Sequence, residues 1–414
     1  MDHRAAARRI VEEAIRSALP DEAVKRALTG RDLPEKITLV AIGKAAWQMA
    51  RAARELLGSR ICRGIVITKY AHAPYPIPGI TIYEAGHPVP DENSYRATQA
   101  AMDLVAGLTQ EDLVLFLISG GGSALFEKPV ISEAEMEGIT RQLLSCGADI
   151  TRMNTIRKRL SAVKGGKFAQ ICAPARVLSI VLSDIIGDPL DMSASGPAYP
   201  DSATTEDALG IVEEFGLVLS EEAMAALRIP TPKVLSNVET VITGSVSQLC
   251  RSAAESCRQM GIAPIILTDS LGCTAREAGS FLASIARYHR HTDHPVAYIL
   301  GGETVVKVPG TGKGGRNQEL ALAPAEGIAG IGNAAVFSVG SDGTDGPTDA
   351  AGGYVDGTTR DKLLCQGIRI PEVLRENDAY HALQKVDGLI ITGPTGTNVN
   401  DLTVLLLDKE ETSL

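Results

Sequence analysis

Glycine-rich and polar stretches follow several short apolar segments of the chain. One of them comes after the apolar residues 113–118 and contains Gly120, Gly121, Gly122 and Ser123. Consecutive glycines allow several backbone N–H groups to point at a single anion, as they do in phosphate-binding loops. The alternative is a flexible turn between a strand and a helix, but three glycines are more than such a turn requires. We therefore predict that these four residues bind a phosphate group.

Two basic residues stand where predicted helices begin. Lys44 comes directly after the apolar residues 37–42 and one glycine. A cation at a helix N-terminus opposes the helix dipole, which favours an anionic ligand over the alternative of a surface lysine. Arg316 opens a second helix after the glycine-rich residues 310–315. Because a guanidinium group can hold a phosphate or carboxylate through two parallel hydrogen bonds, we predict that Arg316 also binds an anion rather than being an ordinary surface residue.

Two carboxylates, Asp184 and Asp188, stand in a loop after the predicted strand 177–183. Paired carboxylates beside a phosphate loop suit Mg²⁺, which takes one or two carboxylates together with water and substrate phosphates. Either carboxylate could instead orient an attacking hydroxyl group. The capping of turns explains both residues equally well. Ser193 follows in the same loop, and we group it with the candidate nucleotide-binding residues.

Three further features have less specific interpretations. The basic segment 152–167 is expected to be a solvated helix face, except that Lys164 near its end could reach an anion and joins the nucleotide-binding candidates. Residues 310–315 satisfy the pattern G-x-G-x-x-G, but they lack the acidic residue about 20 positions further on that dinucleotide binding uses. His72 and His87 stand near loops without metal-ligand spacing, so structural roles are expected for both.

The elements that must position these residues alternate between strand and helix patterns, which predicts βα units around a parallel sheet. The Pro-containing residues 229–233 predict a linker. We therefore predict two α/β domains, residues 1–230 and 231–414, with a ligand site in the cleft between them. Strands are expected at 37–42, 64–68, 80–84, 113–119, 177–183, 238–243, 264–268, 296–300, 304–308, 335–339, 389–392 and 403–407. Helices are expected at 43–57, 91–108 with Asp91 as N-cap, 132–146, 151–170, 205–227, 245–260, 274–289, 316–328 and 371–386.

Composition excludes several classes of function. The 414 residues carry a net charge of −10 and contain no Lys/Arg run that reaches five residues, so nucleic acid is not an expected partner. The longest apolar runs have about six residues, far fewer than the roughly 20 that a membrane span needs. No signal peptide is evident at the N-terminus. Seven scattered Cys without a paired motif predict reduced thiols and a cytoplasmic location. From this chemistry alone we expect an enzyme that handles a nucleotide and a small anionic substrate.

The motifs together resemble one known family, the class II glycerate kinases, whose C-terminal half is called the MOFRL domain. The resemblance spans nearly the whole chain, and its motifs are far more specific together than singly. It is carried by VAIGKAAWQMA (40–50), GHPVPDENS (86–94), LISGGGSAL (117–125), RKRLSAVKGGKFA (157–169), LSDIIGDPLDMSASGP (182–197), GGRNQELAL (314–322), SVGSDGTDGPTDAAGG (338–353) and TGPTGTNVNDL (392–402).

The resemblance implies a Rossmann-like N-terminal domain, a C-terminal α/β domain, and transfer of the γ-phosphate of ATP to D-glycerate with a divalent metal, here Mg²⁺. Lys44 and Arg316 match the family's essential lysine and arginine. The motif match implies that the run from Gly120 to Ser123 holds phosphate. It assigns Asp184 or Asp188 to the metal or to the catalytic base without separating the two roles. A homodimer is compatible with the resemblance.

Two questions stay open at this level. Family members phosphorylate either the 2- or the 3-hydroxyl group, and the general resemblance to archaeal-type members favours the 2-hydroxyl. Some members have been called hydroxypyruvate reductases, so an NAD(P)H-dependent reductase that uses residues 310–315 is one alternative. A protein that binds nucleotide or metabolite without turnover is the other.

Overall fold

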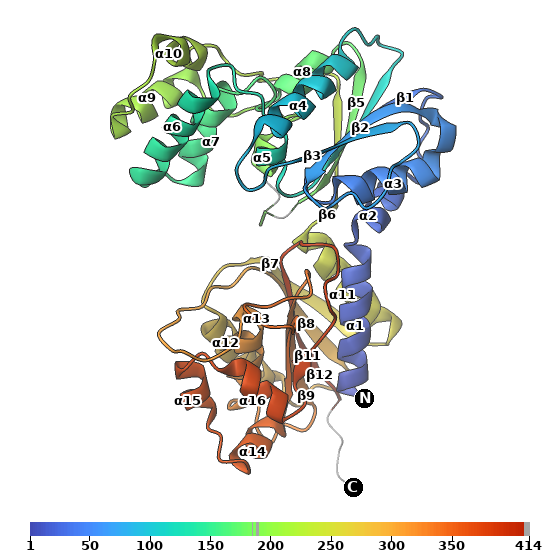
Figure 1. Ribbon diagram of the computed structural model, residues 1–414. Helices are drawn as coiled ribbons and strands as arrows, with labels where there is room; N and C mark the ends of the chain where they lie inside the picture. The colour runs from blue at the N-terminus through green and yellow to red at the C-terminus, as the bar shows by residue number, and fades with distance from the viewer. Residues whose placement is uncertain (184, 188–189, 410–414) are drawn as a thin grey trace. The chain divides into compact units, whose positions relative to one another are not determined.

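The computed structural model describes residues 1–183, 185–187 and 190–409, which form two compact units (Figure 1). The N-terminal unit is Pro20–Thr243, and the C-terminal unit combines Met1–Leu19 with Gly244–Leu414. These bounds differ from the expected division between residues 230 and 231. The strand Val238–Gly244 (β6) joins the N-terminal sheet, and the first helix, His3–Ser17 (α1), packs against Val246–Gln259 (α11) of the C-terminal unit.

The N-terminal unit is built on a six-stranded sheet in the order β3-β2-β1-β4-β5-β6. Strands β1 to β5 pair in parallel, and every residue of β1 and β4 is buried, as expected for a parallel sheet covered on both faces. The chain runs outward from β1 to β3 and then returns to place β4 beside β1. Ligands of such sheets bind outside the carboxyl ends of the strands at this reversal. The first five strands are Ile37–Ile42 (β1), Ile61–Lys69 (β2), Ile80–Ala85 (β3), Leu113–Ile118 (β4) and Arg176–Leu182 (β5).

The helices of this unit form two groups. Some cover the sheet, and α6, α7, α9 and α10 lie together beside it around an apolar core of their own (Figure 1). The predicted N-cap Asp91 is confirmed, because its carboxylate and Ser94 form a capping box at the start of α4. The helices are Pro20–Leu28 (α2), Ala46–Leu57 (α3), Glu92–Val105 (α4), Gly122–Leu125 (α5), Glu133–Ser145 (α6), Ile150–Arg159 (α7), Lys167–Cys172 (α8), Thr205–Phe215 (α9) and Glu221–Leu227 (α10).

The single helix predicted over residues 151–170 is wrong. The structure has two helices there, α7 and α8, separated by residues 160–166. Gly165 and Gly166 adopt φ angles of 60° and 85°, and this left-handed backbone directly precedes α8. The basic residues of segment 152–167 are consequently divided between α7, the residues after it and α8, and they face different surroundings.

The C-terminal unit contains a mixed six-stranded sheet in the order β11-β10-β9-β12-β8-β7. Only the β7–β8 pair is parallel, and the other recorded pairs are antiparallel. The strand predicted at 304–308 is wrong, since β8 ends at Gly302 and Val305 forms only an isolated bridge with Thr274. The strand Gly352–Asp356 (β10) was missed. The others are Ala263–Leu271 (β7), Val296–Gly302 (β8), Ala334–Gly340 (β9), Leu389–Ile390 (β11) and Asp401–Leu407 (β12).

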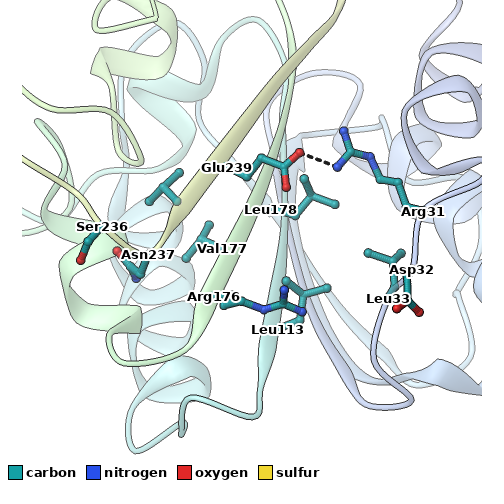
Figure 2. A pocket seen from close by; sticks show the side chains of 11 residues that line it. Arg31, Asp32, Leu33, Leu113, Arg176, Val177, Leu178, Ser236, Asn237 and Glu239 are labelled. Atoms are coloured by element: carbon teal, nitrogen blue, oxygen red, sulfur yellow. Dashed lines mark hydrogen bonds and ion pairs between the residues drawn. The ribbon is translucent and has the colours of Figure 1, made fainter.

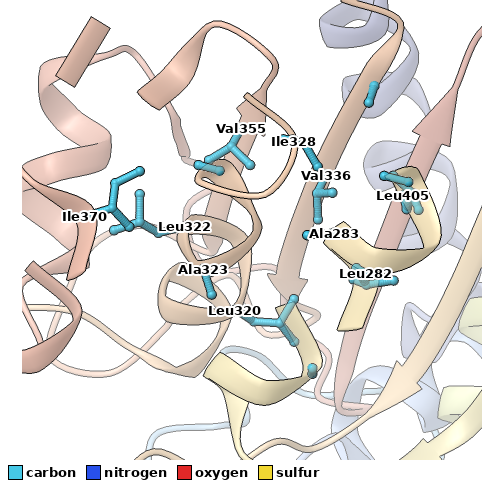
Figure 3. Packing of buried hydrophobic residues seen from close by; sticks show 14 of the residues in the cluster. Leu282, Ala283, Leu320, Leu322, Ala323, Ile328, Val336, Val355, Ile370 and Leu405 are labelled. Carbon is cyan, nitrogen blue, oxygen red and sulfur yellow. The ribbon is translucent and has the colours of Figure 1, made fainter. Parts of the chain in front are cut away.

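A buried apolar cluster fixes helix Arg316–Leu322 (α13) in the C-terminal unit. Figure 3 shows Leu320 near Leu282 of helix Ala275–His289 (α12), with Val336 and Leu405 contributed by the sheet. The two helices approach closely at Gly279, where a Cβ atom would lie 2.5 Å from the carbonyl oxygen of Leu320. The remaining helices are Thr359–Leu364 (α14), Ile370–Arg375 (α15) and Ala379–Lys385 (α16). In the described part of the chain, no helix combines the length and apolar character that crossing a bilayer demands.

Candidate functional site

A pocket of about 320 Å³ opens at the carboxyl ends of the N-terminal strands. Its walls come from the loop after β3, the glycine run after β4, helix α7 and the loop after β5. The position matches the reversal of strand order between β1 and β4, where ligands of such sheets bind. The predicted residues Gly120, Gly121, Ser123 and Ser193 all line it.

The loops after β1 and β4 are fastened together, and this places Lys44 beside the glycine run. The N–H group of Lys44 donates to the carbonyl oxygen of Gly120 at 2.9 Å. The hydroxyl oxygen of Ser119 accepts the N–H of Ala45 at 3.1 Å. Gly43 is required for this approach, since it has a φ of 108° and a Cβ there would lie 2.3 Å from the Ser119 hydroxyl oxygen. The exposed ammonium group of Lys44 has no partner among the described residues.

The glycine run offers free hydrogen-bond donors to the pocket. Within the described part of the chain, the N–H groups of Gly120, Gly121, Gly122 and Ser123 have no recorded acceptor. Gly121 has a φ of 83°, and a side chain there would meet both His87 and the aliphatic part of Lys44. Free N–H groups in such a turn form an anion-binding concavity. The geometry therefore supports the predicted role of this run.

Hydroxyl groups extend the polar wall of the pocket. The hydroxyl oxygens of Ser123 and Ser195 are 2.9 Å apart, and Ser195 donates to the amide oxygen of Asn154 at 3.4 Å. Ser193 is buried, and its hydroxyl oxygen has no hydrogen-bond partner among the described residues. A buried hydroxyl without a partner is costly, so this atom is available to a ligand. The glycine run and the loop after β5 approach each other closely in this wall, since a Cβ at Gly122 would lie 2.7 Å from the Cβ of Ala194.

His87 is a pocket residue that sequence reasoning missed. It follows β3, and its ring packs against Gly121, where a Cβ would lie 3.0 Å from the Nε2 atom. Burial, followed by the positive charge of Lys44, lowers the pKa of His87 below its usual value. The imidazole is therefore neutral at pH 7 and can accept a proton. The motif GHPVPDENS was the available signal, but spacing alone suggested a structural role.

The basic segment 152–167 is not the solvated helix face that the sequence suggested. Lys158 and Arg159 are buried, and they form ion pairs with the buried Asp201 at 3.1 and 3.6 Å. Lys164 is also buried and is ion-paired with Glu127, away from the residues that line the pocket. Burial lowers the pKa of Lys164 to about 8. The structure therefore does not bring Lys164 to the candidate nucleotide site.

The predicted metal ligands Asp184 and Asp188 lie outside the described residues. Among the residues that are described, no three His, Cys, Asp or Glu side chains come together in a group that could hold a metal ion. Nearby Asp191 is engaged by Lys158, whose ammonium nitrogen lies 3.3 Å from its Oδ2 atom. A magnesium site consequently stays a prediction that depends on the two undescribed carboxylates.

Arg316 lies in the C-terminal unit and is bound by two carboxylates. Its Nε and Nη2 atoms donate to Asp401 at 2.6 and 3.0 Å, and Nη1 lies 3.1 Å from Glu303. The sheet brings these partners together, because Asp401 begins β12 opposite Gly302, the last residue of β8. Hydrogen bonding to Asp401 raises the pKa of Arg316, which is permanently charged.

Asp345 holds the start of α13. Its carboxylate accepts the N–H groups of Asn317 and Gln318 at 3.1 and 2.8 Å. A carboxylate at a helix N-terminus is favourable, but burial raises the pKa of Asp345 to about 6. Gly315 permits this contact, since a Cβ there would lie 2.3 Å from the carboxyl carbon of Asp345.

The G-x-G-x-x-G segment packs against protein rather than opening to a ligand. A Cβ at Gly310 would lie 2.3 Å from the carbonyl of Glu376, and one at Gly312 would lie 2.5 Å from the side chain of Asp378. The N–H of Gly312 donates to the Glu376 carbonyl oxygen at 2.8 Å. Dinucleotide binding instead needs the glycines to approach a pyrophosphate. The packing therefore disfavours this use of the segment.

A second hollow of the N-terminal unit, of about 290 Å³, lies at the opposite, amino end of β4 and β5 (Figure 2). Arg31 and Glu239 face each other there, with a separation of 2.5 Å between Nη1 and Oε1. This ion pair already neutralises the arginine. The hollow also lies at the wrong end of a parallel sheet for ligand binding.

The fold and the pocket define a class of protein: an α/β protein with a doubly wound sheet and a pocket at its switch point. Comparisons with known proteins place the chain within that class. Residues 6–228 match a family described as a domain of unknown function (DUF4147), and residues 296–401 match the MOFRL family. The chain belongs to the MOFRL-type glycerate kinase family, as the following relatives show.

D-glycerate 2-kinase of Thermotoga maritima is 51% identical over 404 residues, covering 96% of this chain and 97% of the relative. A crystal structure of glycerate kinase from the same organism has a TM-score of 0.93 and covers 97% of this chain and 99% of that one. A protein of Agrobacterium vitis named putative hydroxypyruvate reductase is 37% identical, covering 97% of this chain and 93% of the relative. The expected family and fold class are confirmed.

Proposed function

We propose that this chain is a D-glycerate 2-kinase, which transfers the γ-phosphate of ATP to D-glycerate and forms 2-phosphoglycerate. The observation that carries the proposal is full-length similarity to a protein named D-glycerate 2-kinase, at 51% identity. The pocket supports it independently. Phosphoryl transfer depends on positioning and on stabilisation of negative charge, and the free N–H donors of the pocket lie beside the Lys44 ammonium group, which has no partner among the described residues.

Each pocket group has a chemical task in this proposal. The N–H groups of the glycine run and the Lys44 ammonium group stabilise the oxygens of the transferring phosphoryl group. Arg316 belongs to the C-terminal unit and is not a lining residue of the pocket. We assign its guanidinium group to an oxyanion of the substrates, as the family resemblance implies. The substrate hydroxyl must lose a proton, and we assign this step to Asp184 or, among the described residues, to the neutral imidazole of His87. A kinase of this kind uses ATP as its co-substrate.

Mg²⁺ would neutralise the phosphate charges of ATP, with Asp184 and Asp188 as its proposed ligands. Because neither carboxylate belongs to the described part of the chain, the roles given to the other residues do not depend on the metal. Activity without added Mg²⁺, measured after treatment with a chelator, would count against this assignment.

The alternative of an NAD(P)H-dependent hydroxypyruvate reductase is favoured only by the name of some relatives. It needs residues 310–315 to hold a pyrophosphate, and Gly310 and Gly312 pack against residues 376 and 378 instead. Oxidation of NADH or NADPH in the presence of hydroxypyruvate would establish the reductase. A non-catalytic binding protein would bind ATP without turnover.

The decisive experiment is ³¹P NMR of the purified protein with ATP, MgCl₂ and D-glycerate. We expect ADP and a new phosphate-ester signal that coincides with authentic 2-phosphoglycerate. A signal at the position of 3-phosphoglycerate would keep the kinase and reject the 2-hydroxyl. No ester signal, with ATP unchanged, would reject the kinase and lead to the reductase assay.

The proposal also covers the compartment and the oligomeric state of the protein. The seven cysteines form no disulfide in the structure, which supports a reducing compartment such as the cytoplasm. A homodimer is proposed from the family resemblance alone. Light scattering coupled to size-exclusion chromatography would test it, with a mass near 87 kDa expected for a dimer of the roughly 44-kDa chain.

A further inference from the structure

Arg157 is a pocket residue whose charge is not neutralised by any residue that the structure describes. Its guanidinium group forms no ion pair or hydrogen bond with any described residue, and its Nε atom is buried. The next two residues behave differently, since both Lys158 and Arg159 are ion-paired with Asp201. A buried donor of a charged group without an acceptor costs free energy. Arg157 therefore stands out as the member of this basic run that lacks an acceptor.

The periodicity of α7 explains why Arg157 faces the pocket. Residues three apart lie on the same helix face, so Arg157 shares its face with Asn154. Asn154 contacts the wall of the pocket, where its amide group lies 3.4 Å from the Ser195 hydroxyl oxygen and 3.5 Å from the sulfur of Met192. Lys158, one residue further along the helix, reaches Asp191 and Asp201 instead.

The other polar groups of the pocket are suited to a negatively charged ligand. No Asp or Glu is among its described lining residues. The glycine run supplies N–H donors without acceptors, and the buried Ser193 hydroxyl lacks a partner. Arg157 adds the planar, doubly donating group that matches a carboxylate or a phosphate. Four kinds of free donor thus meet in one small cavity: backbone N–H, hydroxyl, guanidinium and, at its edge, the Lys44 ammonium group.

We propose that Arg157 binds an oxyanion of the substrates in this pocket, as a recognition residue distinct from Lys44 and Arg316. The oxyanion is either the carboxylate of D-glycerate or a phosphate of ATP. This inference rests on the proposed function for the identity of the ligand, but not for its charge. It also separates Arg157 from Lys158 and Arg159, whose charges stabilise the fold.

The test compares Arg157→Gln and Arg157→Lys with the wild type, using Arg152→Gln as the control. Arg152 lies on the same helix, but it is paired with Asp149 and Glu214 at the surface. We expect Arg157→Gln to raise one Michaelis constant by roughly 10- to 100-fold, the effect of losing hydrogen bonds to a charged group. A rise in KM for D-glycerate identifies the carboxylate, and a rise in KM for ATP identifies the phosphate. Arg157→Lys should recover part of the loss, and Arg152→Gln should stay within twofold of the wild type.

Michaelis constants and kcat all within twofold of the wild type in Arg157→Gln would overturn the proposal. An equal change in Arg152→Gln would also overturn it, since it would indicate a general effect of surface charge. Because Arg157 has no ion pair to lose, we expect the Tm of Arg157→Gln to match the wild type. A marked fall in Tm would instead show a structural role.

A binding measurement separates this inference from the proposed function. Calorimetric titration of the wild type and of Arg157→Gln with inorganic phosphate, and separately with D-glycerate, requires no turnover. If the wild type fails to phosphorylate D-glycerate but binds one of these anions at least tenfold more tightly than the variant, the kinase proposal fails and the role of Arg157 stands. Equal binding of both anions by the two proteins would reject the role of Arg157 whatever the reaction.

Discussion

The pocket of the N-terminal unit and the Arg316 cluster of the C-terminal unit treat positive charge in opposite ways. At the pocket, Arg157 in its lining and Lys44 beside its glycine run have no acidic partner among the described residues. In the cluster, the guanidinium group of Arg316 is bonded to both Asp401 and Glu303. The two regions carry similar residue types, but only one of them presents cations that are free to bind.

The free cations at the pocket and the paired Arg316 can therefore serve a reaction in different ways. A free cation can accept an anion without breaking a contact, so the pocket is prepared for binding. Arg316 has a fixed geometry, and together with its two carboxylates it carries a net negative charge. It can act on a substrate only through a donor that its partners leave accessible, or after one carboxylate moves. We therefore expect substitution of Lys44 to lower activity with little effect on stability, and substitution of Arg316 to lower both.

Lys44→Ala should produce the largest effect on activity with little effect on the fold. Loss of a group that stabilises transition-state charge lowers kcat by roughly 100-fold or more. The ammonium group has no recorded partner, so its removal leaves no buried group unsatisfied. Steady-state kinetics and thermal unfolding of the variant measure both quantities. Lys36→Ala is a matched control, because Lys36 is also exposed and directly precedes β1, the strand that comes before Lys44.

Turnover of Lys44→Ala close to that of the wild type would remove Lys44 from the reaction. It would also show that an unpaired cation at the pocket has no more effect on turnover than a surface one.

Arg316→Ala should impair activity and stability together. We expect kcat to fall by roughly 100-fold, and the free energy of unfolding to fall by about 1–3 kcal/mol, since the buried Asp401 loses its partner. Chemical denaturation measures the second quantity. The double variant Arg316→Ala/Asp401→Asn should recover part of the stability but none of the activity. Wild-type stability of Arg316→Ala would show that the ion pair between Arg316 and Asp401 does not hold β8, β12 and α13 together.

Lys164→Met should affect stability alone, and so tests whether a buried basic residue outside the pocket takes part in binding. Removing the ammonium group leaves the carboxylate of Glu127 buried and unpaired, which costs about 3 kcal/mol. We expect unchanged Michaelis constants for the folded enzyme at low temperature. The double variant Lys164→Met/Glu127→Leu should be more stable than the single one. A selective rise in KM for ATP would restore Lys164 to the nucleotide site.

The smallest effect concerns pH and the Asp345 carboxyl. Its pKa is about 6 in the folded chain against an ordinary value of 3.8, so the folded state binds more protons between these values. Stability therefore falls as pH rises from about 4 to 6, by up to about 2 kcal/mol after allowance for nearby charges. Asp345→Asn should be less stable overall, but it should lack this slope. Denaturation curves at pH 4, 5, 6 and 7 would show it, and parallel pH profiles for both proteins would contradict the assignment.

Much of the fold was predictable because local patterns were strong. The strand at 37–42 and the capping box at Asp91 are as predicted, since continuous apolar runs and N-cap residues report local structure directly. The strand at 304–308 is wrong because apolar alternation there leads to no sheet partner beyond one bridge. The glycine-rich strand β10 was missed because its pairing with β9, not its own composition, makes it a strand.

The alternating α/β pattern, the glycine run and the family motifs could be predicted from the sequence, because they depend on residue type and near-neighbour spacing. Which charges are free depends instead on the folded chain. Within the run Arg157, Lys158 and Arg159, one positive charge lies in a pocket and the other two are ion-paired with Asp201, more than 40 positions later in the chain. Burial and long-range pairing are properties of the folded chain, so spacing cannot reveal them. His87 became a pocket residue for the same reason, through contact with a loop more than 30 positions later in the chain.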